Sequence, residues 1–275
     1  MSANGSEVEF DKVNGALCSW KQAGKEWIKS PLLPNFWRPV TDNDMGNGMN
    51  YTLRAWREAG KNARLEEMTH HALNEGGYEV VSTYRLDSVA GSTFKITYRM
   101  QSRGCLDVEC LFIPANDTLP LMPRMGVSVG LAREASQMSW LGRGPHENYC
   151  DRNTSAYVGL YHGAVKDKCY LYDRPQENGN KTDVRWMSLT DAQGAGLMAI
   201  GQPFLSTSAW PYDPASLDEP GLRKSQRHQS DVRESDVITW NLDLKQMGVG
   251  GDTSWGAFPH QQYLIPAERQ SFSFR

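Results

Sequence analysis

The alternating stretch Phe94-Lys95-Ile96-Thr97-Tyr98-Arg99-Met100 decides the fold class of this 275-residue chain. Apolar and polar residues take turns along it, as they do on a strand with one buried face. After Gly104 the chain repeats the pattern in Leu106-Asp107-Val108-Glu109-Cys110-Leu111-Phe112, with Asp107 and Glu109 on the polar face. Two alternating runs around a glycine predict a half-buried antiparallel hairpin.

The rest of the sequence predicts the same kind of structure. Near the start, Asn14-Gly15 is a strong signal for a tight turn between two short runs. Only one segment is typical of a helix, with Thr52 as its cap, Leu53 and Trp56 on one side and Gly60 at its end. Many strands with almost no helix predict an all-β antiparallel sandwich. Further strands are expected at residues 7–10, 17–21, 80–86, 125–129, 197–200, 237–242 and 263–265.

Length and charge narrow the class of protein. The chain is long enough for a large core, and no linker or repeat divides it, so residues 7–275 are expected to form one domain. Residues 1–6 resemble a leader left by recombinant expression, outside the domain proper. A net charge of −3 favours neither nucleic acid nor a membrane surface as a partner. No apolar run reaches the roughly 20 residues that a membrane-spanning helix needs.

The cysteines and histidines indicate neither a disulfide framework nor a metal site. Five cysteines occur, which is an odd number, and none forms a CxxC pair. Cys110 falls on the apolar face of its run, where a thiol packs like a small hydrophobe. His70-His71 is the only histidine pair, and side chains of neighbouring residues point apart. We therefore expect no metal bound by this chain.

A glycine-rich run near the C-terminus, Gly248-Val249-Gly250-Gly251-Asp252-Thr253-Ser254-Trp255, is the strongest functional signal. Its glycines allow tight backbone approaches and positive φ angles. The flat indole beside small polar groups suits the apolar face of a sugar ring, whose hydroxyls the polar groups would bind. The alternative is a bulged strand end whose tryptophan packs into the core, and the residues alone leave both interpretations open.

Three further polar runs have both a structural and a functional interpretation. Residues 145–152 present His146, Glu147, Asn148 and Tyr149 on a loop that could close over a ligand, or form a turn tied by Glu147 and Arg152. In residues 35–44, Asp42-Asn43-Asp44 is expected to organise a loop with Arg38 rather than to bind a cation or a sugar. Residues 174–180 are rich in amides, which carbohydrate-binding surfaces and ordinary turns share.

These runs, in this order and at these separations, resemble the C-terminal domain of large β-galactosidases of glycoside hydrolase family 2. The resemblance covers the chain from about residue 7 onward and implies a large antiparallel super-sandwich, similar to that of galactose mutarotases. Residues 174–179 are a fourth match. The three main matches are Arg38-Pro39-Val40-Thr41-Asp42-Asn43-Asp44, Trp140-Leu141-Gly142-Arg143-Gly144-Pro145-His146-Glu147-Asn148-Tyr149 and the glycine-rich run that ends at Trp255.

The resemblance implies a role in substrate binding for two loops. Trp255 would form part of the galactoside-binding platform, and residues 144–152 would lie near the cleft and shift as substrate settles. This chain has Cys150 where the family usually has a proline, which leaves the rigidity of that loop open. The residues expected to bind substrate are Trp255, Asp252, Gly144, His146, Glu147 and Asn148.

The resemblance also implies that the cleavage chemistry lies elsewhere. Retaining hydrolysis needs two carboxylates about 5 Å apart, and in the family both stand on a (β/α)₈ barrel. No alternating strand–helix pattern that would build this barrel is present. We therefore predict no catalytic residue in this chain and no hydrolysis by it alone. The Mg and Na ions of the enzyme are expected on the missing catalytic domain.

The leading hypothesis is a domain that completes the galactoside site of a β-galactosidase. Its partners would be galactosides such as lactose, the remaining domains of the same polypeptide and further copies of the enzyme in a homo-oligomer. The alternatives are a stand-alone carbohydrate-binding module, a structural domain, and a mutarotase-like epimerase that uses a histidine and a glutamate. For the last, the candidates are His146, His162, His228 and His260 with Glu147 or Glu177. A cytoplasmic location is favoured over a periplasmic one.

Overall fold

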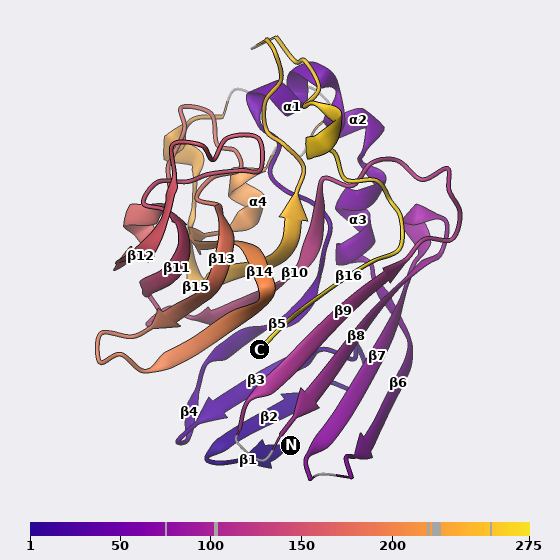
Figure 1. Cartoon of the computed structure of the whole chain (residues 1–275), viewed down its shortest axis with the longest axis vertical. Coiled ribbons are helices and arrows are strands. Elements are labelled where there is room, and N and C mark those ends of the chain that lie inside the picture. The colour runs from indigo at the N-terminus through magenta and orange to yellow at the C-terminus, as the bar shows by residue number, and fades with distance from the viewer. Residues whose placement is uncertain (75, 102–103, 219–220, 222–226, 254) are drawn as a thin grey trace.

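The chain folds into a large, curled, antiparallel β structure, seen in a computed structural model that describes residues 1–74, 76–101, 104–218, 221, 227–253 and 255–275. Two groups of strands curve toward one another, and short helices lie beside them at one end of the molecule (Figure 1). The predicted all-β super-sandwich is confirmed. Its strands are β1 (Ser2–Ala3), β2 (Ser6–Phe10), β3 (Leu17–Gln22), β4 (Lys25–Glu26), β5 (Ile28–Asn35), β6 (Arg64–Ala72), β7 (Tyr78–Leu86), β8 (Ser92–Met100), β9 (Leu106–Ile113), β10 (Arg124–Ala132), β11 (Gln137–Gly144), β12 (Tyr157–Ala164), β13 (Lys181–Thr190), β14 (Gly196–Tyr212), β15 (Glu234–Gln246) and β16 (Gln270–Phe274).

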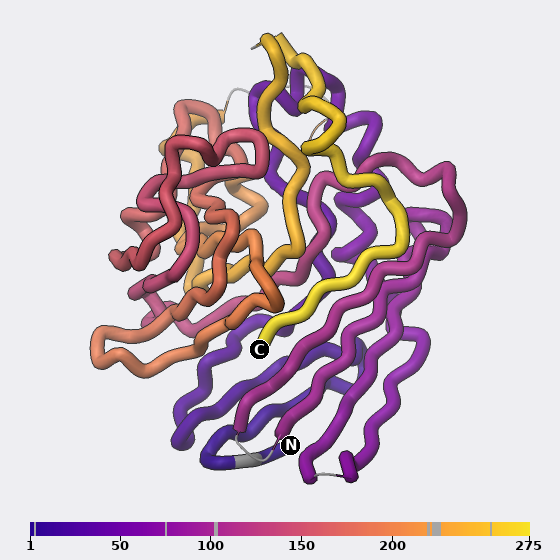
Figure 2. Tube along the Cα trace, viewed as in Figure 1, coloured from indigo at the N-terminus to yellow at the C-terminus, as the bar shows by residue number. Residues whose placement is uncertain are grey.

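Two sheets share these strands. The larger has 12 strands, and most of them follow the order β12-β11-β13-β14-β16-β9-β8-β7-β6. From β14 a branch leads through β15 and β10 to β5. A smaller sheet joins β1 to β4 in sequence order. The tube in Figure 2 shows the C-terminal segment crossing between the two groups of strands, where β16 pairs with both β9 and β14.

The hairpin that indicated the fold class is β8 and β9. Phe94 pairs with Phe112 and Tyr98 with Val108, and the apolar side chains of both strands are buried. Gly104 in the turn has a φ of 76°, which is why the turn needs a glycine. The ring of Phe94 meets that of Phe36 edge-on at 5.1 Å between centroids. The predicted hairpin is therefore confirmed, and its apolar face forms part of one aromatic core.

The helix predicted from Thr52 to Gly60 is present with a later start, at Ala55–Lys61, and it buries Trp56 as expected; the structure adds two further short helices before it. Three short ones lie between β5 and β6: α1 (Asp42–Asn47), α2 (Met49–Thr52) and α3 (Ala55–Lys61). Thr52 ends α2 instead of capping a helix, because its hydroxyl donates to the Gly48 carbonyl oxygen. The first helix was missed because its capping box, Thr41 with Asp44, lies in a run without apolar periodicity. The predicted strand at 263–265 is also wrong, since Gln261–Tyr263 forms a 3-10 helix.

The structure also bears on the expectations for the N-terminal residues, the cysteines and the histidine pair. Ser2–Ala3 pairs with β2, whereas the origin of residues 1–6 stays a prediction. All five cysteines are free, and Cys110 is buried. His71, on the edge strand β6, lies 3.5 Å from Glu79 of β7, measured between Nε2 and Oε1. No helix in the described part of the chain combines the length and apolar character that crossing a membrane requires.

Candidate functional site

The four runs singled out in the sequence meet at one end of the molecule. In Figure 1 the segment after β15 lies beside α1 at the top of the view. Arg38 joins these two parts: its guanidinium donates to the carbonyl oxygens of Met247 and Gly248, the latter at 2.9 Å, and pairs with Asp44 at 2.9 Å. Arg38 and Asp44 are fully buried. The predicted organising role of the 35–44 run is confirmed.

The other runs are joined to this pair. Arg174 donates to Asp42 at 2.8 Å and to the Val40 carbonyl oxygen at 3.0 Å, so residues 174–180 pack on the 38–44 run. Asp151, in the 145–152 loop, accepts the backbone N–H of Gly250 at 2.8 Å. Residues far apart in the sequence therefore build one rigid base for the glycine-rich loop.

The far end of the glycine-rich loop is fixed through Asn43. Its amide nitrogen donates to the Ala257 carbonyl oxygen at 2.9 Å, and its amide oxygen accepts the Gly256 N–H at 3.1 Å. Gly256 has a φ of 95°, and a Cβ there would lie 2.2 Å from the backbone of Gly46. Only glycine permits this approach, because any side chain would collide with backbone that cannot move aside.

A pair of glycine substitutions tests this anchoring. We expect Gly256→Ala to lower the melting temperature of the chain, since it adds both a collision and a strained φ. Gly250→Ala is the matched control, because its Cβ would meet only a carboxylate oxygen of Asp151 at an ordinary 3.7 Å. Thermal unfolding followed by circular dichroism measures both. Equal melting temperatures for the two variants would contradict the proposed close approach.

Trp255 projects from this anchored loop into solvent. Its side chain is 88% exposed, whereas Trp56, Trp140 and Trp210 are buried. The alternative interpretation, in which Trp255 packs into the core, is therefore wrong. Its backbone N–H donates to the Thr253 hydroxyl at 3.4 Å, and Ser254 lies outside the described residues. An exposed indole on an anchored loop can pack against the apolar face of a ligand or of another protein.

A polar cavity of about 350 Å³ lies beside the same loop. Asp252 and His260 border it and contact each other at 2.7 Å between Oδ1 and Nε2. Asp151 and Arg152 also line it. The cavity therefore carries carboxylate, imidazole and guanidinium groups, which bind hydroxyls well.

The loop at 145–152 is tied down, as the structural interpretation predicted. Glu147 pairs with Arg152 at 2.5 Å, accepts the Tyr172 hydroxyl, and accepts the Gly179 N–H at 2.7 Å. His146 stays exposed and contacts the Ser155 hydroxyl at 3.0 Å. Among the predicted site residues of this loop, His146 is the exposed one, while Glu147 is half-buried and Gly144 and Asn148 are buried.

Two other predicted site residues of this run, Asn148 and Gly144, make contacts inside the protein. Asn148 is fully buried; its amide donates to backbone oxygens of Arg143 and His146 and accepts both donors of Thr182. A Cβ on Gly144 would lie 2.8 Å from the Tyr161 ring and 2.9 Å from the Trp140 ring. These contacts do not support direct binding of substrate by Asn148, which stays a prediction, as does a direct role for Gly144.

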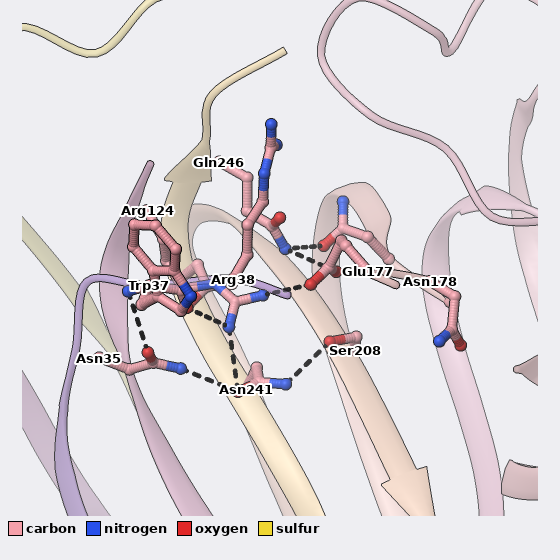
Figure 3. A network of polar contacts seen from close by, with 12 residues as sticks. Asn35, Trp37, Arg38, Arg124, Glu177, Asn178, Ser208, Asn241 and Gln246 are labelled. Atoms are coloured by element: carbon pink, nitrogen blue, oxygen red, sulfur yellow. Dashed lines mark hydrogen bonds and ion pairs between the residues drawn. The ribbon is translucent and has the colours of Figure 1, made fainter. Parts of the chain in front are cut away.

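A buried ionic network below the loops was missed in the sequence. Arg124 pairs with Glu177 at 3.2 Å and with Asp243 at 3.3 Å, and all three side chains are at most 1% exposed. Figure 3 shows that the network extends to Gln246, at the end of β15, whose side-chain amide donates a hydrogen bond to Glu177 at 3.3 Å. Burial raises the pKa of Glu177 and of Asp243 to about 7, against the opposing effect of Arg124. A lone aspartate at the end of the apolar 237–242 run was the available signal for Asp243.

The histidine–glutamate pair of a mutarotase-like enzyme does not form. Across the described residues, neither Glu147 nor Glu177 forms a hydrogen bond or ion pair with a histidine. His146 contacts Ser155 and His260 contacts Asp252 instead. The same part of the chain brings together no three histidine, cysteine or acidic side chains in a metal-binding arrangement. The end of the molecule therefore offers binding groups without an acid–base pair of this type.

Fold and site together define an all-β super-sandwich domain that presents one exposed indole on a loop bordering a polar cavity. The chain belongs to the family described as the beta galactosidase small chain, whose model matches residues 2–275. The predicted resemblance to the C-terminal domain of family 2 β-galactosidases is thereby confirmed.

Full-length relatives agree with this assignment. A protein named Beta-galactosidase from Priestia megaterium is 37% identical over 94% of this chain, and one from Lactobacillus delbrueckii subsp. bulgaricus is 34% identical over 98%. The match to a Beta-galactosidase of Vibrio cholerae is 31% identical over 96%. The chain covers 24%, 26% and 26% of these three proteins, so it spans about a quarter of their length.

Proposed function

We propose that this chain completes the galactoside-binding site of a β-galactosidase whose catalytic domain lies outside it. The full enzyme would release terminal β-D-galactosyl residues, and this domain would hold the sugar. The observation that carries the proposal is the exposed indole of Trp255 on a loop that Arg38, Asn43 and Asp151 anchor. Anchoring matters, because a preorganised wall loses little conformational entropy when the sugar arrives.

The distribution of carboxylates supports a binding role over a cleaving one. Hydrolysis by retention needs two carboxyl groups that flank the scissile bond. Glu177 and Asp243 are fully buried against Arg124, and Glu147 is engaged by Arg152, Tyr172 and Gly179. Asp252 is exposed and faces the cavity with His260, where it would accept hydrogen bonds from sugar hydroxyls. We place the Mg and Na ions of the enzyme on the missing domain.

A row of apolar side chains on the outside of the large sheet supports the presence of further domains. Leu160 of β12 pairs with Leu141, Leu141 with Trp186, and Trp186 with Ile200, so four adjacent strands bring them to one face. Leu160 is 67% exposed and Ile200 42%. A continuous apolar row is unusual on the surface of a protein that works alone. We propose that another domain or a second subunit of the enzyme covers this row.

Activity measurements on separated parts test the proposal. We expect the purified 275-residue chain to hydrolyse neither lactose nor a nitrophenyl galactoside. The remainder of the polypeptide, produced without this chain, should regain activity when the chain is added, and less so with Trp255→Ala. Hydrolysis by the chain alone would contradict the proposed division of labour. Equal rescue by both forms of the chain would contradict the role of Trp255.

A further inference from the structure

Among the described residues, three strands of the 12-stranded sheet pair on one side only: β5, β6 and β12. Such a strand presents unpaired N–H and C=O groups, and proteins ordinarily protect it with charged side chains, prolines or a covering segment. β6 carries Arg64, Glu66 and Glu67, and β5 carries Pro31 and Pro34. β12 pairs with β11 alone among the described strands, and it has neither charged residues nor prolines.

The exposed side chains of β12 are apolar, whereas those of β6 include several charges. The eight residues Tyr157–Ala164 contain no lysine, arginine, aspartate or glutamate. Tyr157 is 75% exposed, Leu160 67% and Val158 47%. Figure 1 shows β12 beside β11 at the left of the view, at the end of its group of strands. An edge strand of this length and composition is a template for pairing with a further strand.

The geometry of antiparallel pairing limits how two identical strands can meet. Opposite residues either both direct their N–H and C=O groups toward the partner strand or both direct them away from it. A two-fold axis that relates two identical strands therefore passes beside one residue and not between two.

The sequence of β12 fits a second copy of itself around Leu160. An axis at Leu160 places Gly159 opposite Tyr161 of the second copy, and Tyr157 opposite Gly163. Each large ring then lies opposite a glycine, which leaves room for it. No like charges meet across the axis, because the strand has no acidic or basic residue apart from a histidine.

The same register extends the apolar row on the outer face of the sheet. Leu160 pairs with Leu141, Leu141 with Trp186 and Trp186 with Ile200. With Leu160 opposite its counterpart in the second copy, the row runs from Ile200 of one copy to Ile200 of the other. Cα atoms of opposite residues in an antiparallel pair lie about 4.5–5.5 Å apart, so the two leucines would be in contact.

We infer that β12 is a homodimer interface, at which it pairs antiparallel with β12 of a second copy around a two-fold axis at Leu160. Main-chain hydrogen bonds along the two edges join the large sheets, and the apolar row beside them is buried. The inference narrows the partner that covers this row to a second copy of the chain. It does not depend on the role of Trp255 in binding a galactoside.

Sedimentation of the 275-residue chain tests whether this edge forms a dimer. We expect a dimer at micromolar concentrations. Leu160→Lys should raise the Kd of the dimer at least about tenfold, because two ammonium groups would face each other at the axis. Thr69→Lys is the matched control, since Thr69 is an exposed residue on β6, at another edge of the same sheet. Circular dichroism checks that both variants fold.

An engineered disulfide tests the register. The expected Cα separation at the axis lies within the range of about 4.4–6.8 Å that a disulfide spans. Cys105 is exposed, so Cys105→Ser provides the background. In this background, mild oxidation of Leu160→Cys should join two chains on a non-reducing gel, whereas Thr69→Cys should remain a single chain. The same substitution in the complete polypeptide should join two subunits.

Three results would overturn the inference. One is a chain that sediments as a monomer throughout the micromolar range. Another is a dimer that Leu160→Lys leaves intact and Leu160→Cys does not crosslink, which would place its interface elsewhere. The third is a crosslink that forms in the isolated chain but not in the complete polypeptide, where another domain would then cover β12. All three are independent of the kinetics of Trp255→Ala, so the proposed sugar site is tested separately.

Discussion

Replacing Trp255 by alanine in the β-galactosidase polypeptide that contains this chain should raise KM for lactose by at least about tenfold, or about 1.4 kcal/mol. The indole is 88% exposed here, so its removal leaves the fold of this domain intact. A large aromatic wall beneath a sugar contributes contact area that no smaller side chain replaces. The loss would fall mainly on KM if ground state and transition state use the platform equally.

Steady-state kinetics with lactose and a nitrophenyl galactoside measure this effect. Trp255→Phe should recover part of the affinity, because it restores a flat ring. Tyr78→Ala is the matched control: Tyr78 is an aromatic residue 50% exposed on β7, where it pairs with Ala72 of β6 and Met100 of β8 rather than with the candidate site. Unchanged KM for both substrates in Trp255→Ala would reject the proposed platform.

Replacing Arg124 by alanine should reduce the free energy of unfolding by about 3–5 kcal/mol at neutral pH. The substitution leaves Glu177 and Asp243 in the interior without their shared cation. It also removes the hydrogen bond from the guanidinium to the Trp37 carbonyl oxygen at 3.1 Å. Urea unfolding followed by tryptophan fluorescence gives the change. Lys21→Ala is the control, since the exposed pair of Lys21 with Glu9 should contribute at most about 1 kcal/mol.

The loss should depend on pH in a defined direction. Burial raises the pKa of Glu177 and Asp243 to about 7, above the values of the unfolded chain. Protonation of these groups therefore favours the folded state, and that stabilisation is lost as the pH rises through about 7. Without Arg124 the ionised forms are less well compensated, so the deficit should be larger at pH 8 than at pH 5. A loss below about 1 kcal/mol at both pH values would contradict the role of Arg124.

Much of the fold could be predicted because one period dominates the sequence. Alternation identified β8 and β9 to within a few residues, and the Asn14-Gly15 signal correctly placed the turn between β2 and β3. Of the short helices only α3 was predicted, through Trp56 and Gly60, with a start at Thr52 that is three residues too early. The other two have too few residues for apolar periodicity, and α1 depends on the capping box of Thr41 and Asp44, a pattern that is also typical of a turn.

The candidate site was predictable in part. Its runs were recognised, and Trp255, Asp252 and His146 indeed present exposed side chains. The burial of Asn148 was not predictable, because its partners in Thr182 and Arg143 are brought near only by the pairing of distant strands. The Arg124 network was missed for the same reason: its members stand 53 and 119 residues apart in sequence from Arg124, on separate elements. The pattern of apolar residues in a sequence shows the periodicity of one segment, whereas such networks depend on which distant strands pair in the fold.

The most direct test of the account is a crystal structure of the full β-galactosidase with a bound galactoside. The measurement is the separation between the Trp255 indole and the galactosyl ring. We expect the two planes to lie in van der Waals contact, at about 4 Å, with the bond to be cleaved facing carboxylates of another domain. An indole that packs against protein in the assembled enzyme, with the sugar bound out of its reach, would contradict it.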